Sequence, residues 1–179
     1  MAKFVIQQSK HLEGEVSISG MKNATTPILV ATLLTNQPCV ISNIPRIKDV
    51  EKMIEILISI GSQVKWLDRH TIEINNQHVV SASLNKILVR SMRSSVLLLG
   101  AGLARFSKII LPEPGGCIIG NRPLDTHFYA LKKLGVKIEQ KDGNYNLSTK
   151  QLVGNYIVLP EFSVTATENT SLASVLARG

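Results

Sequence analysis

Residues 46–61 read RIKDVEKMIEILISIG, and residues 122–135 read RPLDTHFYALKKLG. In both stretches an arginine and an aspartate precede an amphipathic helix that ends at a glycine, Gly61 or Gly135, the residue type favoured just after a helix. The apolar side chains at helical spacing are Val50, Met53, Ile54, Leu57 and Ile58 in the first helix and Phe128, Leu131 and Leu134 in the second. The chain therefore contains two copies of one pattern.

The segments that flank these helices repeat in the same order. A helix rich in small residues and a short strand precede each one, and a pair of strands follows it. The predicted segments are helix 23–35, strand 39–42 and strands 63–66 and 71–74 in the first copy, and helix 91–105, strand 108–111 and a hairpin around Asp142-Gly143 in the second. A helix at 167–178 opens a third copy. The sequence therefore predicts an α/β fold built from repeated units.

A repeat that stops after its first helix leaves that helix and one sheet edge uncovered. We therefore expect a longer protein, of which this chain is a truncated piece that pairs or aggregates through the uncovered edge. The alternating residues from Phe4 to Ser19 predict strands that belong elsewhere. We expect residues 1–20 to supply strands of a second domain and residues 21–179 to form an incomplete first domain. The repeats of that first domain lie at about 21–85 and 86–160, with a partial repeat at 161–179.

Composition excludes several classes of protein. The 179 residues carry a formal net charge of +7, but the basic residues are scattered and only one Trp, three Tyr and four Phe could stack on bases, so nucleic-acid binding is not expected. No run of about 18 apolar residues and no targeting segment occurs, which favours a cytoplasmic protein without a membrane partner. Cys39 and Cys117 form no metal spacing, and we expect no metal and no cofactor.

Residues 114–127 concentrate the reactive side chains. Pro114-Gly115-Gly116-Cys117 sets a thiol in a glycine-rich loop, where it could face a ligand or be a buried structural cysteine. Cys39 lacks polar companions and is predicted to lie in the core. Lys22 and Arg93 stand at predicted helix starts, where cations are unfavourable unless an anion binds; two solvated cations are the alternative.

Five motifs together resemble one family. They are Gly20-Met21-Lys22-Asn23-Ala24, Ser91-Met92-Arg93, Pro114-Gly115-Gly116-Cys117, Gly120-Asn121-Arg122-Pro123-Leu124-Asp125-Thr126-His127 and Ser163-Val164-Thr165-Ala166-Thr167-Glu168-Asn169. The residue types in these motifs, and the order of the motifs along the chain, resemble those of the UDP-N-acetylglucosamine enolpyruvyl transferase (1-carboxyvinyltransferase) family. The resemblance implies two domains, each an inside-out α/β barrel of three similar units with helices inside and strands outside. This chain would supply the first strands of one domain and most of the other.

The resemblance also implies an enzyme and its site. The family transfers the enolpyruvyl group of phosphoenolpyruvate to the 3-hydroxyl of UDP-N-acetylglucosamine, releasing phosphate, in peptidoglycan synthesis. The resemblance implies that Cys117 is the general acid, that it forms a covalent adduct and that it is the fosfomycin target. It also implies that Lys22 and Asn23 bind phosphoenolpyruvate. The implied UDP-N-acetylglucosamine-binding residues are Arg93, Arg122, Pro123, Leu124, Asp125, Thr126, Ser163 and Val164. The family's catalytic aspartate lies beyond this chain, so we expect the chain alone to be inactive.

Several simpler interpretations stay open. Asp125 could be a helix cap without any ligand contact, and His127 could be a surface or ion-paired histidine. Thr165 replaces a glycine usual in the family and Glu161 a frequent basic residue, and both changes put nucleotide binding in doubt. The chain could also be a non-catalytic nucleotide-sugar binding module. The related transferase acting on shikimate 3-phosphate is disfavoured by Asn23 and by the cysteine loop.

Overall fold

The computed structural model describes residues 3–8, 11–79, 84–114 and 123–179. Its first unit contains α1 (Lys22–Ala31), the 3-10 helix η1 (Thr32–Leu34), β1 (Cys39–Ile41), α2 (Lys48–Ser59), β2 (Gln63–Trp66) and β3 (Ile72–Asn75). Its second unit contains α3 (Lys86–Arg90), the 3-10 helix η2 (Arg93–Leu97), α4 (Leu98–Phe106), β4 (Lys108–Pro112), α5 (Asp125–Lys133), β5 (Lys137–Lys141) and β6 (Asn144–Ser148). The helix α6 (Val164–Ser174) then opens the third copy.

The strands form two antiparallel three-stranded sheets with equivalent strand orders, β1-β3-β2 and β4-β6-β5. Ile41 lies opposite Ile72 in the first sheet, and Leu111 lies opposite Tyr145 in the second. Burial alternates along β3, where Ile72 and Ile74 are fully buried and their neighbours are not. One face of each sheet therefore packs on helices while the other faces solvent, as expected for a half-buried antiparallel sheet.

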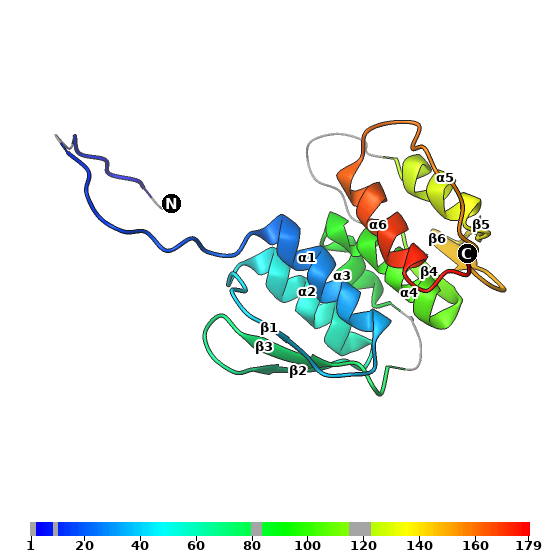
Figure 1. The fold of residues 1–179 in the computed structure, drawn as a ribbon, viewed down its shortest axis with the longest axis horizontal. Helices are drawn as coiled ribbons and strands as arrows, with labels where there is room; N and C mark the ends of the chain where they lie inside the picture. The colour runs from blue at the N-terminus through cyan, green and yellow to red at the C-terminus, as the bar shows by residue number, and fades with distance from the viewer. Residues whose placement is uncertain (1–2, 9–10, 80–83, 115–122) are drawn as a thin grey trace.

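The helices lie inside and the sheets outside (Figure 1). Residues Leu98 to Leu103 of α4 are all buried, which is the pattern of a helix surrounded by protein on every side. α4 packs against α6 and against α1, and the two sheets lie on two different outer sides of these helices. The predicted α/β fold of repeated units with helices inside is confirmed.

The helix ends and the hairpin agree with their sequence signals. Gly61 and Gly135 follow α2 and α5 with φ of 108° and 89°, a left-handed conformation that costs glycine little. The same backbone bond closes both helices, from Ser62 N to Leu57 O at 3.0 Å and from Val136 N to Leu131 O at 3.1 Å. Asp142 and Gly143 both have positive φ, as a two-residue hairpin of the predicted kind requires.

Four details differ from the sequence prediction. Ile58 is 51% exposed, and Ile56 is buried in its place. The predicted helix 91–105 is split into η2 and α4, and the short helix α3 before it was missed. α6 begins at Val164 rather than at 167, because the Ser163 hydroxyl accepts from Ala166 N at 3.3 Å and caps the helix. Cys39 is half-buried at the start of β1 rather than in the core.

Residues 3–8 and 11–19 form no strand and extend away from the folded body (Figure 1). Their apolar side chains are exposed, and Phe4 is 99% exposed. Gly20 N donates to Asn43 Oδ1 at 2.9 Å where this segment joins α1. The predicted strand pair is therefore absent from this structure, and its assignment to a second domain stays a prediction.

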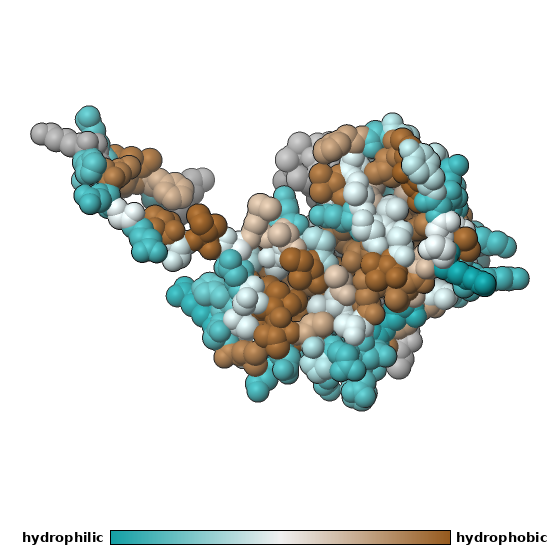
Figure 2. Space-filling model, viewed as in Figure 1, coloured by the Kyte–Doolittle hydropathy of each residue, from teal (hydrophilic) through white to brown (hydrophobic). Residues whose placement is uncertain are grey.

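The folded body also exposes apolar side chains. Figure 2 shows brown surface over α1 and around the end of α6, and the exposed apolar residues of these regions include Ile28, Val175 and Leu176. A further packed layer would bury such surface. In the described parts of the chain no helix is long and apolar enough to cross a bilayer.

Candidate functional site

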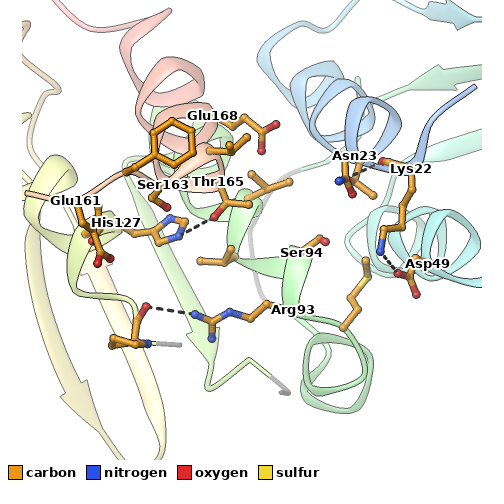
Figure 3. A pocket seen from close by; sticks show the side chains of 18 of the residues that line it. Lys22, Asn23, Asp49, Arg93, Ser94, His127, Glu161, Ser163, Thr165 and Glu168 are labelled. Carbon is orange, nitrogen blue, oxygen red and sulfur yellow. Dashed lines mark hydrogen bonds and ion pairs between the residues drawn. The ribbon is translucent and has the colours of Figure 1, made fainter. Parts of the chain in front are cut away.

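A cleft of about 1000 Å³ opens between the starts of α1 and α2 on one side and the starts of α5 and α6 on the other (Figure 3). η2 contributes residues between these two sides. The polar residues that line the cleft are Lys22, Asn23, Thr26, Asp49, Ser91, Arg93, Ser94, Thr126, His127, Glu161, Ser163, Thr165 and Glu168. Residues from all three copies of the repeat therefore meet at one place.

The charges that line the cleft are mixed, with carboxyl groups at Asp49, Glu161 and Glu168, but three helix starts give part of the cleft a preference for anions. α1, η2 and α6 begin beside it, and the first turns of these three helices contain no acidic residue. The backbone N–H groups and dipole of a helix start attract negative charge, and Lys22 and Arg93 add two cations at two of the starts. Several phosphate or carboxylate oxygens could be held here. Among the described residues no group of His, Cys, Asp and Glu side chains could hold a metal ion.

An ion pair holds Lys22 on one side of this cleft. Lys22 Nζ lies 2.9 Å from Asp49 Oδ2, which joins the first residue of α1 to the first turn of α2 (Figure 3). Both side chains are a little more than 40% exposed, so water screens the pair and it contributes little to stability. An incoming anion can therefore compete for the ammonium at low cost.

Two hydrogen bonds connect the segments that line the opposite side. Arg93 donates from Nη2 to the carbonyl oxygen of Pro123 at 3.3 Å, which ties η2 to the segment before α5. The Thr126 hydroxyl donates to Glu161 Oε1 at 2.6 Å, which ties the first turn of α5 to the segment before α6. The predicted nucleotide-binding segments around 123–126 and 163–164 are thus brought side by side.

His127 is buried between the cleft and the core. Its Nε2 lies 3.3 Å from Thr165 Oγ1, and its Nδ1 lies 3.0 Å from Asn169 Nδ2. Burial, reinforced by the positive charge of Arg93, lowers the pKa of His127 to about 4. The imidazole is therefore neutral at pH 7, and it is neither the surface nor the ion-paired histidine considered from the sequence. Burial also raises the pKa of Glu168, the half-buried carboxyl group of α6 at the cleft.

The structure brings most predicted site residues together. The cleft is lined by Lys22, Asn23, Arg93, Pro123, Thr126, Ser163 and Val164. Leu124 is buried in the core instead, and Asp125 is exposed at the start of α5 and does not line the cleft. Asp125 does not cap this helix either, because the N-cap is Leu124. Cys117 and Arg122 lie outside the described residues, so their roles stay predictions.

Other residues of the cleft were missed from the sequence. The sequence marks Asp49 only as a feature of the repeat and Glu161 only as a departure from the family, yet both side chains line the cleft. Asn169 belongs to the last motif, but the resemblance gives it no role; it is buried behind the cleft, where it contacts His127. A polar residue inside a helix of small and apolar residues was the available signal for Asn169, since buried amides need partners.

The low pKa of His127 predicts how stability depends on pH. The unfolded chain protonates this imidazole near its ordinary pKa of 6.5, whereas the folded chain does so near 4. The stability that the neutral imidazole gives the folded chain is complete above pH 6.5 and falls by roughly 3 kcal/mol as pH falls to 4. Urea unfolding at several pH values should show this loss in the native chain, and a smaller loss in His127→Gln. Equal slopes in the two proteins would contradict it.

Comparison with known proteins decides the family. The family model of EPSP synthase (3-phosphoshikimate 1-carboxyvinyltransferase) matches residues 6–179. The chain belongs to the EPSP synthase family. Relatives named UDP-N-acetylglucosamine 1-carboxyvinyltransferase match its full length, with 44% identity in Carboxydothermus hydrogenoformans and 46% in Caldanaerobacter subterraneus subsp. tengcongensis. The chain spans only 42% and 43% of the lengths of these two relatives.

Two solved structures share the fold. The enolpyruvyl transferase NikO from Streptomyces tendae aligns with a TM-score of 0.73 at 20% sequence identity, covering 94% of this chain and 40% of NikO. EPSP synthase from Acinetobacter baumannii aligns with a TM-score of 0.70 at 17% identity, covering 93% of this chain and 39% of that enzyme. At these identities the likeness concerns the fold alone, and it supports the helices-inside architecture.

Proposed function

We propose that this chain forms one wall of an enolpyruvyl transferase site, in which phosphoenolpyruvate reacts with the 3-hydroxyl of UDP-N-acetylglucosamine in the cytoplasmic synthesis of peptidoglycan. The observation that carries the proposal is the meeting of Lys22, Arg93 and three helix starts at one cleft. Both substrates are polyanions, which these cations and helix starts would attract. The names of the relatives at 44% and 46% identity supply UDP-N-acetylglucosamine and the transferred carboxyvinyl group. Phosphoenolpyruvate as the donor is what the resemblance implies.

The reaction gives each group a role. The hydroxyl oxygen bonds to C2 of phosphoenolpyruvate while its proton leaves, and C3 takes up a proton. Loss of a proton from C3 and of phosphate from C2 then gives the enolpyruvyl ether. In this proposal Lys22 and Asn23 hold phosphoenolpyruvate, Arg93 holds anionic oxygens, and Cys117 supplies the proton and can form a covalent adduct. The part of the relatives' length that this chain does not span would provide the opposite wall and the base.

The test joins this chain to the remaining three fifths of the Caldanaerobacter relative and measures phosphate release. We expect release that needs both substrates, and fosfomycin labelling of Cys117 that needs UDP-N-acetylglucosamine. Cys117→Ser should lose the labelling, whereas the matched variant Cys39→Ser should keep it. Equal labelling of the two cysteines would contradict the assignment of Cys117.

The same joined protein separates the alternatives. Binding of UDP-N-acetylglucosamine without phosphate release would favour a non-catalytic binding module. Release that requires shikimate 3-phosphate instead of the nucleotide sugar would favour the activity after which the family is named. We expect neither result, because the relatives that match the full chain are named for the nucleotide sugar.

A further inference from the structure

Asn169 is a buried amide whose orientation can be read from its partners. It lies in α6 and is fully buried. Gly100 N donates to its Oδ1 at 2.7 Å, while its Nδ2 lies 2.8 Å from Val96 O and 3.0 Å from His127 Nδ1. A backbone N–H can only donate and a backbone carbonyl can only accept. The contacts with Gly100 and Val96 therefore agree on which side-chain atom of Asn169 is the oxygen and which is the nitrogen. The nitrogen therefore faces the histidine.

This orientation determines where His127 carries its proton. The Asn169 amide donates to Nδ1, so Nδ1 has to accept and holds no proton. A neutral imidazole then carries its proton on Nε2, which lies 3.3 Å from Thr165 Oγ1. If Nδ1 were protonated, its N–H group would face the N–H group of the Asn169 amide, and neither could accept a hydrogen bond. The charged groups that share the cleft with His127 are Arg93 from η2, Glu161 before α6, Glu168 in α6 and, on the opposite side, the ion pair of Lys22 and Asp49.

Thr165 is the outward end of this chain of hydrogen bonds. It is exposed in the first turn of α6 and lines the cleft beside Ser163. Its oxygen accepts from His127 Nε2–H, which leaves the hydroxyl hydrogen to donate elsewhere. Each bond runs in the same direction, from the core amide of Asn169 toward the cleft, and bonds aligned in this way polarise one another. A ligand oxygen in the cleft is the acceptor that this arrangement suits.

We propose that Asn169 is a positioning residue that holds His127 in the Nε2–H tautomer, so that the Thr165 hydroxyl donates to an oxygen of the bound nucleotide sugar. The identity of that ligand rests on the function proposed above, whereas the tautomer does not. The threonine that stands in this chain thus adds a contact to the cleft.

The first experiment needs no ligand. NMR of the 179-residue chain labelled with ¹⁵N-histidine distinguishes a protonated from an unprotonated ring nitrogen. We expect His127 to show unprotonated Nδ1 and protonated Nε2 at neutral pH, with His127→Gln identifying its signals among those of the four histidines. A native His127 with a proton on Nδ1 would overturn the proposal.

Two variants test the two ends of the network. Asn169→Asp places an acceptor beside Nδ1, so we expect Nδ1 to become protonated; an unchanged tautomer would overturn the proposal. Thr165→Val should keep the native tautomer but raise the dissociation constant of UDP-N-acetylglucosamine for the joined protein by about 3- to 10-fold, the effect of one hydrogen bond. Thr165→Ser is the matched control, because it keeps the hydroxyl, and we expect nearly native affinity.

The outcomes separate this inference from the proposed function. If the native joined protein binds no UDP-N-acetylglucosamine, the proposed ligand is wrong, and with it the outward contact of Thr165, while the tautomer result is read independently. If the native protein and Thr165→Val bind equally well, the function stands and the donor role of Thr165 is overturned.

Discussion

Replacing Arg105 by methionine is expected to lower the free energy of unfolding by about 3 kcal/mol. Its guanidinium bridges the two units of the fold, from the end of α4 to the first unit. Nη1 donates to Leu33 O at 2.8 Å and to Thr35 O at 3.1 Å, and Nη2 donates to Asn36 Oδ1 at 2.7 Å and to Asn76 O at 2.6 Å. Few side chains in the described parts of the chain have so many partners.

The size of the effect follows from the acceptors. Leu33 O and Thr35 O lie at the end of η1, where carbonyl groups lack helical partners and a cation is favourable. Burial lowers the pKa of Arg105, but a guanidinium remains charged at neutral pH. Methionine fills similar space without a donor, so these carbonyls would be left partly desolvated and unpaired. Lysine keeps the charge but lacks the planar fork, and we expect an intermediate loss.

Arg178 supplies the matched control. It ends the Leu-Ala-Arg sequence of the third copy, as Arg105 does in the second, but its side chain makes no hydrogen bond within the described part of the chain. Urea unfolding followed by circular dichroism should therefore show a large loss for Arg105→Met and nearly native stability for Arg178→Met. Equal losses in the two variants would mean that the bridge between the units is not stabilising.

Local sequence signals predicted where helices and turns occur better than they predicted which face of a helix is buried. Glycines after helices and an Asp-Gly pair work through the backbone alone, so Gly61, Gly135 and the hairpin could be read directly. The buried face of α2 could not, because spacing of about 100° per residue describes a stripe without its centre. The structure centres that stripe between Met53 and Leu57, which brings Ile56 in and leaves Ile58 out.

Site residues could be predicted where their position relative to a helix start singled them out. They could not be predicted where their role depends on contacts with residues distant in sequence. Lys22 and Arg93 could be singled out because cations at helix starts are unusual. Asp49, Glu161 and Asn169 could not, since their partners are distant in sequence; Asn169 reaches Gly100 across 69 positions. His127 likewise needed the fold, because its low pKa comes from burial and from Arg93.

Replacing Gly100 by alanine is expected to lower the free energy of unfolding by about 4 kcal/mol. Alanine in a helix interior would by itself be favourable by about 1 kcal/mol, so any loss reports the surroundings of the new methyl group. A Cβ at Gly100 would overlap the backbone carbonyl oxygen of Asn169 and would lie 2.8 Å from its Oδ1 and 3.0 Å from Leu172 Cβ. Backbone atoms cannot rotate aside, so α4 and α6 would have to separate.

Gly102 provides the control within the same helix. A Cβ there would meet Ile109 Cδ1 at 2.6 Å, and the next nearest atoms belong to the same flexible side chain. We expect Gly102→Ala to stay within about 1 kcal/mol of the native stability in urea unfolding, because an isoleucine terminus can change rotamer. Similar losses for the two variants would show that the close approach of α4 and α6 is not what restricts position 100. The same approach sets Gly100 N against the amide oxygen of Asn169, so Gly100→Ala should also disturb the tautomer of His127 and Gly102→Ala should not.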